Sequence, residues 1–296
     1  MNWFKRLKIG TKITAIFSLA VLLIGTSAYV VMVRESRNAI QKEIGESSAI
    51  LTQTVLDRVD LNILNRMEMM KSFSRDLILQ EAILASSREF EQFSGVKETV
   101  EKRDQEWTSA PQDAITPFMR SLMETKASEE LRDVMESLRI SDGSARVFGE
   151  VFVTNAYGAN VAQTGKTTDY YQADEEWWQT AKSNGFSISD VAYDESALVH
   201  SVDIGIAIND KSEKFIGVMK GVLNINDVIH TMKEVERLGK EESGRIQSFK
   251  LLTGDGRLIY STKSDWGFLA ELSGEEFMRQ MLSSAHNSET DAVMRG

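Results

Sequence analysis

Hydrophobic residues near the start of the chain follow two successive patterns. Residues 13–33 read ITAIFSLAVLLIGTSAYVVMV, without a single charged side chain. A helix of this length covers about 30 Å, which is the thickness of the hydrocarbon core of a bilayer. From Arg34 to about residue 90, apolar residues recur mostly three, four or seven positions apart. This second pattern predicts a long amphipathic helix that continues the membrane span.

The basic residues around the span predict its orientation. Lys5, Arg6, Lys8 and Lys12 precede it, and basic residues stay on the cytoplasmic side of a membrane. We therefore expect a cytoplasmic N-terminus, a helix in the inner membrane, and a periplasmic or extracellular region from residue 34 to 296. A cleaved signal peptide is the alternative, because Thr26-Ser27-Ala28 offers small residues for cleavage. Residues 29–33 extend the apolar run to full spanning length and favour the uncleaved anchor.

After a polar, mostly helical stretch interrupted at Pro111 and Pro117, the pattern changes to short β-type runs. Two strands, a short helix, three more strands and a closing helix that begins at Asp227 are expected. This order is typical of an antiparallel sheet with helices on one side, an α+β module. The expected strands are 147–154, 160–164, 186–193, 198–208 and 215–224.

A second, shorter series of elements follows the first module. A strand over 246–253, a turn at Gly254-Asp255-Gly256, a return strand over 257–262 and a helix over 274–284 are expected. These elements open a second module of the same kind, which is incomplete by residue 296. The expected organisation is a cytoplasmic tail (1–12), a transmembrane helix (13–33), a long amphipathic helix (34–90), a first module (91–238) and the start of a second (239–296).

The composition of the chain excludes several kinds of partner and chemistry. Acidic residues outnumber basic ones 44 to 34, a net charge of −10, which argues against nucleic acid as a partner. The chain has no cysteine, and its three histidines do not stand at helical ligand spacing, so we expect no disulfide, no metal site and no cofactor. No G-x-S-x-G, H-E-x-x-H or glycine-rich phosphate loop is present. We therefore expect no catalytic residue, with an anchored enzyme and an anchored binding protein without signalling output as alternatives.

One segment concentrates aromatic and acidic residues. Residues 164–185 read TGKTTDYYQADEEWWQTAKSNG, with two tyrosines and two tryptophans inside nine positions. In one interpretation Asp174 caps a helix, Glu175 and Glu176 fill its first turn, Gly185 ends it, and the tryptophans pack on the sheet. In the other, the aromatic side chains line a ligand pocket. Local chemistry leaves both interpretations open.

Three motifs carry a resemblance to a known family. They are YYQADEEWWQ at 170–179, SDVAYDES at 189–196 and GVMKGVL at 217–223. Together with the order of anchor, long helix and two modules, they resemble the extracellular double-Cache sensor domain, which has two PAS-like modules. This domain occurs in bacterial chemoreceptors, sensor histidine kinases and cyclic-di-nucleotide enzymes. The resemblance implies a receptor that binds a small molecule in the membrane-distal module and signals across the membrane, most simply as a chemotaxis transducer, with a kinase or cyclic-di-nucleotide output beyond residue 296 as the alternative.

The resemblance also implies which residues touch the ligand. In the amino-acid-binding branch an arginine stands where this chain has Glu175, and an aspartate stands where it has Asn226. A glutamate repels a carboxylate that an arginine would hold, so amino acids and simple organic acids are disfavoured. Asp174, Glu175 and Asp194 beside aromatic faces suit a cation instead. We also expect a homodimer through the long helix. The expected ligand-binding residues are Tyr170, Tyr171, Asp174, Glu175, Trp177, Trp178, Tyr193, Asp194 and Asn226.

Overall fold

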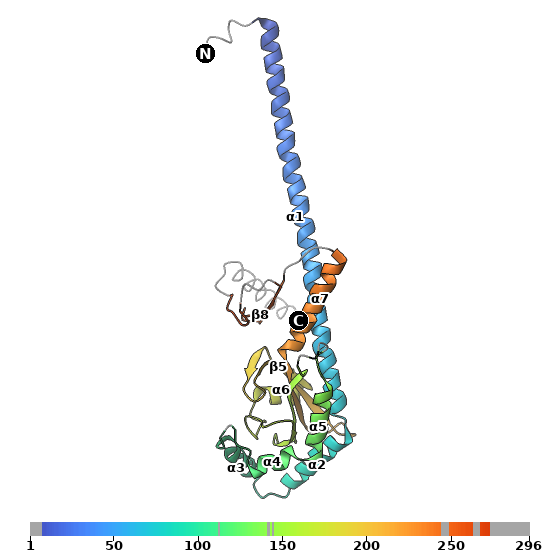
Figure 1. Cartoon of the computed structure of the whole chain (residues 1–296), viewed down its shortest axis with the longest axis vertical. Coiled ribbons are helices and arrows are strands. Elements are labelled where there is room, and N and C mark those ends of the chain that lie inside the picture. Colours follow the sequence, from blue (N-terminus) through green and yellow to red (C-terminus); the bar gives the residue numbers. More distant parts are fainter. Residues whose placement is uncertain are drawn as a thin grey trace. The chain divides into compact units, whose positions relative to one another are not determined.

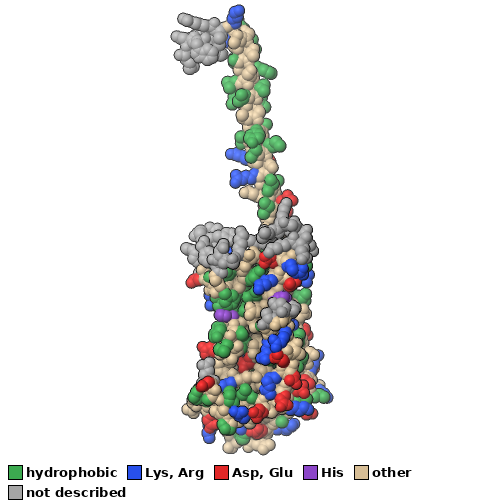
Figure 2. Space-filling view, in the orientation of Figure 1, with side chains coloured by type: hydrophobic (Ala, Val, Ile, Leu, Met, Phe, Trp, Pro, Cys, Tyr) green, Lys and Arg blue, Asp and Glu red, His purple; other side chains and the backbone are tan. Residues whose placement is uncertain are grey.

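A computed structural model describes residues 8–111, 113–140, 143, 145–243, 249–262 and 267–272. The chain divides into two compact units, residues 1–56 and 57–296. The first unit consists of the N-terminal part of helix α1 (Ile9–Phe73). Among the described residues, α1 is the one helix long and apolar enough to cross a membrane, with a mean hydropathy of 2.3 over its most apolar window. Figure 2 shows hydrophobic side chains along this part of α1, with basic side chains on either side of them.

The long helix differs from its expected extent. It ends at Phe73, and a separate helix α2 (Leu77–Phe90) follows. The interruption has a local cause, because the carboxylate of Asp76 accepts hydrogen bonds from the backbone N–H groups of Ile78 and Leu79. Such an N-cap satisfies amide groups that have no partner inside the new helix. The amphipathic pattern therefore continues across two helices rather than one.

The second unit is built on an antiparallel sheet with the strand order β2-β1-β6-β5-β3, and β4 pairs with β5 beside β3 (Figure 1). The α+β class expected from the sequence is confirmed. The strands are β1 (Phe148–Thr154), β2 (Asn160–Gln163), β3 (Phe186–Ile188), β4 (Ala192–Asp194), β5 (Val199–Asn209) and β6 (Phe215–Asn224).

The two faces of this sheet differ in chemistry. One face is apolar and fully buried, with Val151, Ile204 and Met219 among its side chains. On this face Gly221 leaves room for α1, because a Cβ there would lie 2.7 Å from the Sδ of Met70. The opposite face carries helix α6 (Glu176–Asn184), which ends at Gly185 in the left-handed conformation, with φ 89°. We call this second surface the α6 face.

Three short helices, α3 (Val96–Thr108), α4 (Pro117–Met123) and α5 (Lys126–Ser137), precede the sheet. Figure 1 shows α3 and α4 together at one end of this unit, near α2. They enclose a separate aromatic core in which the indole N–H of Trp107 donates to the carbonyl of Thr167, 2.9 Å away. The proline-containing stretch thus supplies a small core of its own beside the sheet.

Three further expectations are corrected in detail. The strand expected over 186–193 is split into β3 and β4, because the carboxylate of Asp190 accepts from the backbone N–H of Val191 and from that of Gly254. The closing helix α7 (Ile225–Ser243) begins before Asp227, and the side-chain oxygen of Asn224 accepts from its first turn. In α6 the capping position is Glu175 rather than Asp174, and its side chain makes no capping hydrogen bond.

The start of the second module is described in part. Strands β7 (Lys250–Leu252) and β8 (Leu258–Ser261) form the expected hairpin. Its turn contains Gly256 with φ 87°, a backbone conformation that favours glycine. The helix expected over 274–284 lies outside the described residues.

Candidate functional site

The α6 face of the sheet carries charged side chains, whereas the opposite face carries only apolar ones. The pairing register gives this directly: Glu150 on β1 and Asp203 on β5 both lie opposite Val222, which makes them members of one row across the sheet. Lys220 on β6 lies in the next row, opposite Phe152 and Gly205. Burying a charge costs free energy unless it is paired, so one buried and two partly buried charged side chains on this face indicate a candidate site.

Lys220 and Asp203 form an ion pair at the centre of this face. The ammonium group lies 2.8 Å from Oδ2 of Asp203, and the hydroxyl of Ser201 donates to the other carboxylate oxygen at 3.1 Å. Both charged side chains are largely shielded from solvent, 13% and 23% exposed. The ammonium also lies 5.1 Å from the ring centroid of Trp177 and 5.9 Å from that of Phe152, within cation–π range.

The close approach of the Trp177 ring to the sheet depends on a glycine in β5. A Cβ at position 205 would lie 2.3 Å from the Ser187 hydroxyl and 3.2 Å from the indole of Trp177. No real Cβ tolerates the first of these distances. Gly205 therefore allows α6 to place an aromatic ring directly over the ion pair.

The side-chain amide of a buried glutamine in the same row has no hydrogen-bond partner among the described residues. Gln163 on β2 lies opposite Phe152, on the α6 face, and is fully buried. Within the described part of the chain neither its Nε2 nor its Oε1 has a partner. Buried polar groups are nearly always hydrogen-bonded in native proteins. An amide with both a free donor and a free acceptor is therefore suited to a polar ligand group.

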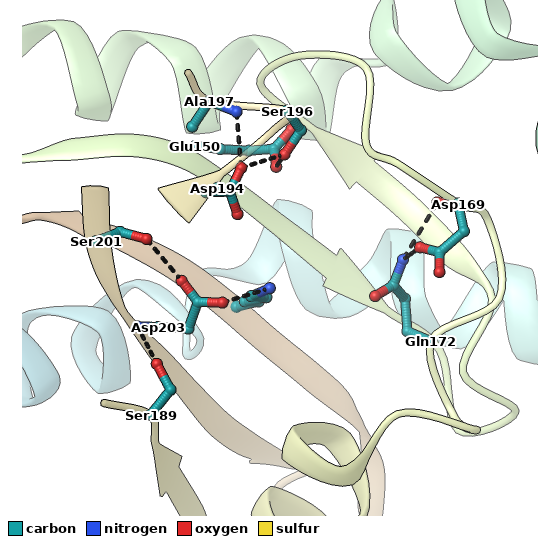
Figure 3. Close-up of polar contacts among 10 residues, drawn as sticks. Glu150, Asp169, Gln172, Ser189, Asp194, Ser196, Ala197, Ser201 and Asp203 are labelled. Atoms are coloured by element: carbon teal, nitrogen blue, oxygen red, sulfur yellow. Dashed lines mark hydrogen bonds and ion pairs between the residues drawn. The ribbon is translucent and has the colours of Figure 1, made fainter. Parts of the chain in front are cut away.

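Glu150 lies beside this group and is linked to the strand pair β4–β5. It is 4% exposed, and its Oε2 lies 2.8 Å from the hydroxyl of Ser196, which in turn lies 2.6 Å from Oδ1 of Asp194 (Figure 3). The pKa of Glu150 is raised to about 7, chiefly by burial and also by the nearby charges of Asp194 and Asp203, whereas the Ser196 hydrogen bond and Lys220 oppose the rise. The site therefore contains a carboxyl group that titrates near neutral pH.

Two cavities meet at Ser196. One, of about 450 Å³, is lined by Glu150 and by Arg132 and Arg146. The other, of about 520 Å³, is lined by Lys166, Glu195 and Leu198 among others. Volumes of this size match small-molecule sites in proteins, and Glu150 lines the first of these cavities.

A second buried carboxyl group lies apart from this group. Asp169, in the loop between β2 and α6, contacts the side-chain amide of Gln172 (Figure 3). Burial raises its pKa to about 6, and the charge of Asp104 contributes to the rise.

Of the residues expected to bind the ligand, Trp177 and Asp194 lie at this site. Trp178 is a core residue whose indole N–H donates to Thr154 Oγ1 at 2.9 Å, and Tyr170 is buried in the aromatic core with α3 and α4. The backbone N–H groups of Tyr170 and Tyr171 both donate to the carboxylate of Asp104.

The remaining four lie elsewhere. Asp174 and Glu175 are exposed before α6. Tyr193 is half exposed and packs edge-on against His200, with 5.1 Å between the ring centroids. Asn226 lines a third cavity of about 580 Å³ with His200. The expected residues thus lie in several separate places rather than in one pocket.

Sequence reasoning missed Glu150, Gln163, Asp203 and Lys220. A signal for two of them was present in the strands. In β5, Asp203 alternates with the apolar residues Val202 and Ile204, and Lys220 interrupts an otherwise apolar run in β6. A charged residue at a position whose neighbours in both directions are buried would have indicated the site.

No protein-family model matches this chain, and no curated protein does. Among solved structures, the sensor domain of the V. cholerae histidine kinase DctB is 11% identical, with 79% of this chain and 75% of that one covered and a TM-score of 0.42. The ligand-binding domain of the Pseudomonas aeruginosa PAO1 amino acid chemoreceptor PctB, in complex with L-Arg, is 14% identical, with 65% and 69% covered and a TM-score of 0.33.

A third structure is the ligand-binding domain of the Pseudomonas fluorescens chemoreceptor CtaA in complex with L-alanine. It is 17% identical, with 66% of this chain and 74% of that one covered and a TM-score of 0.31. The matching structures are sensor domains of chemoreceptors and histidine kinases, the class that the sequence motifs resemble. Identities and TM-scores this low describe a likeness only.

Proposed function

We propose that this chain is the sensor region of a membrane-anchored receptor, and that it binds a small molecule carrying an ammonium group on the α6 face. The observation that supports this most is the excess of acidic groups over basic ones: Asp203 pairs with the cation Lys220, and Asp194 and the buried carboxyl group of Glu150 are linked through Ser196. The excess of negative charge beside two aromatic rings favours a positively charged ligand group. The role is binding rather than catalysis.

The proposed ligand is thus cationic, as expected from the sequence, but the protein residues that bind it differ from the expected ones. Asp203 takes the place that Asp174 and Glu175 had in the expectation, because those two side chains are exposed. The ligand ammonium would compete with Lys220 for Asp203 and for the face of Trp177. The free donor and acceptor of Gln163 would hold a second polar group of the ligand.

A zwitterionic amino acid is the second candidate ligand. Lys220 favours it, because an ammonium on the protein side can pair with a ligand carboxylate while Asp203 pairs with the ligand ammonium. The two candidates differ in their need for Lys220. A diamine gains when this positive charge is removed, whereas an amino acid loses its carboxylate partner.

Isothermal titration of the full chain in detergent micelles tests the proposal with putrescine, ethanolamine, L-alanine and succinate as probes. We expect heat from an amine and none from succinate, and at least tenfold weaker binding in Asp203→Asn. Asp174→Asn is the matched control and leaves affinity unchanged. Lys220→Met separates the candidates: it abolishes binding of L-alanine and preserves that of putrescine. Silence with all four probes, or equal loss in the control, would reject the site.

We further propose that the N-terminus is cytoplasmic and that α1 serves as the dimer contact. Lys8 and Lys12 precede the apolar part of α1, in keeping with the positive-inside rule. Ile40, Ile44 and Ile50 are 53%, 59% and 70% exposed on the same helix, and a partner helix would cover them. Cysteine cross-linking at position 44 in membranes tests the dimer, with Lys42→Cys as the control position on another face.

Chemotaxis is the output that we propose for this receptor. The coding sequence downstream of residue 296 tests this. A coiled helical hairpin rich in alanine, glutamate and glutamine would support chemotaxis. A histidine-bearing dimerisation helix followed by a nucleotide-binding domain would replace it with a kinase.

A further inference from the structure

The hydroxyl of Ser196 stands between two carboxyl groups. Its Oγ lies 2.8 Å from Oε2 of Glu150 and 2.6 Å from Oδ1 of Asp194 (Figure 3). Both distances are those of hydrogen bonds. A serine hydroxyl has a single hydrogen and can donate only once, so one of the two contacts must be made with a hydrogen that belongs to a carboxyl group.

The remaining contacts identify the protonated carboxyl. Oδ1 of Asp194 also accepts from the backbone N–H of Ala197 at 2.7 Å, so this oxygen serves as an acceptor. The serine hydrogen then points to Asp194. Glu150 must supply the hydrogen of the other contact, donating from its own O–H to Oγ of Ser196. The geometry is that of a protonated Glu150 that donates to Ser196, which donates in turn to Asp194.

The surroundings of Glu150 favour its neutral form. It is 4% exposed, and the cation beside it on the sheet, Lys220, is already paired with Asp203 at 2.8 Å. Burial and the charge of Asp194 hold the pKa of Glu150 well above its usual range. The charged groups that face Glu150 are Asp194, Asp203 and Lys220 from β4, β5 and β6, and Arg132, Asp133, Glu136 and Arg146 across the cavity of about 450 Å³.

This bridge holds the β4–β5 turn (residues 195–198) against β1. The turn approaches so closely that a Cβ on Gly149 would lie 2.9 Å from the Cβ of Ala197. Its last residue, Leu198, has φ 55°, a strained conformation for a leucine, and is 67% exposed. The turn also borders the two cavities that meet at Ser196. A change at the bridge would therefore alter access to both.

We propose that Glu150, Ser196 and Asp194 form a proton-binding switch, which makes external pH a second stimulus of this domain beside its small-molecule ligand. With its proton, Glu150 donates to Ser196 and the turn is held on β1. When the proton leaves to solvent, two carboxylates compete for one hydroxyl hydrogen and repel each other, and the turn is released. No bond other than the O–H of Glu150 is broken.

Spin-label spectroscopy of the full chain in detergent micelles tests this. The chain has no cysteine, so Leu198→Cys gives a unique attachment point on the turn. In the otherwise unchanged chain we expect the label to become more mobile as pH rises from 5 to 9, with one midpoint near neutrality and the steepness of a single proton. Asp169→Asn, which removes another buried carboxyl group away from the turn, is the matched control and keeps the transition.

Two variants decide the outcome. Glu150→Gln carries a permanent donor in place of the protonated acid, and the label stays immobile at every pH. Ser196→Ala removes the bridge, and the label is mobile at every pH. Infrared difference spectra supply a readout that does not depend on the label. In Asp169→Asn, which lacks the other buried carboxyl group with a raised pKa, the carbonyl band of protonated Glu150 disappears over the same pH range, and this band is absent when Glu150→Gln is added. The proposal would be overturned if the pH-dependent change in label mobility persisted in Glu150→Gln, or if the mobility of the label in the unchanged chain did not depend on pH.

Discussion

Arg66 on α1 and Asp227 on α7 are joined by two parallel hydrogen bonds, from Nε to Oδ2 and from Nη2 to Oδ1, each 2.9 Å long. The residues are 161 positions apart in the chain. Asp227 is 3% exposed, so the pair is shielded from solvent screening on one side. A bidentate pair of this kind fixes the relative orientation of the two side chains as well as the distance between them. It ties the helix that follows the sheet to the helix that precedes it.

Neutralising this pair is expected to destabilise the domain. Asp227→Asn keeps the shape of the side chain and removes its charge, which leaves the guanidinium of Arg66 with weaker acceptors in a partly buried place. The free energy of unfolding should fall by about 2 kcal/mol, measured by chemical denaturation followed by circular dichroism. Glu124→Gln breaks an exposed pair with Arg120 and should cost about 0.5 kcal/mol or less. Equal costs in the two variants would contradict a special role of the buried pair.

The two neighbouring tryptophans should respond differently to the same substitution. Trp178→Phe deletes the indole donor that serves Thr154 Oγ1 in the core and should lower the free energy of unfolding by about 2 kcal/mol. Trp177→Phe keeps an aromatic ring over Lys220 and should change stability by under about 1 kcal/mol, while weakening ligand binding. Thermal unfolding and titration calorimetry on both variants give the comparison. Binding lost only in Trp178→Phe would move the site away from Lys220.

Gly205→Ala should displace α6. The added methyl group would lie 2.3 Å from the Ser187 hydroxyl, so the helix must shift or the serine must turn away. We expect a loss of about 1–3 kcal/mol in the free energy of unfolding and a shift in the fluorescence of Trp177. The control is Gly165→Ala, whose new Cβ would meet Glu150 Oε1 at an ordinary contact distance of 3.7 Å. An unchanged spectrum in Gly205→Ala would show that α6 has room to spare.

Stability is expected to fall as pH rises from about 4 to 7. Glu150 and Asp169 have pKa values of about 7 and about 6 in the folded chain, above those of unfolded carboxyl groups. The folded state therefore binds more protons than the unfolded state between these values, and the free energy of unfolding decreases with pH. For Glu150 the full effect is about 3 kcal/mol. Glu150→Gln should flatten the part of the profile between about pH 5 and 7, as measured by denaturation at a series of pH values.

Much of the fold could be predicted from the sequence because it rests on local patterns. The apolar run of residues 13–33, the alternation in the strands and the turn at Gly254-Asp255-Gly256 each determine their own element. The interruption at residues 74–76 and the split between β3 and β4 were missed. Both depend on a single aspartate, Asp76 or Asp190, whose carboxylate binds nearby amides, and an isolated aspartate carries no such information in the sequence.

The candidate site was harder to predict because its residues come from separate strands. Glu150, Asp203 and Lys220 meet only through the strand order β1-β6-β5 and its register. The aromatic segment around Trp177 suggests that neighbours in sequence share one pocket. Successive residues of this segment in fact face different surroundings. Trp177 contacts Lys220, whereas Trp178 contacts Thr154 in the core.

Gln163 has a practical consequence for finding the natural stimulus. Its side-chain amide is fully buried and has no hydrogen-bond partner within the described residues, so a compound that reached this amide and matched it would gain two contacts. Such a compound should raise the melting temperature noticeably even at moderate affinity. A metabolite collection screened by thermal shift, with Gln163→Leu as the reference protein, would therefore single out the compounds that use this amide.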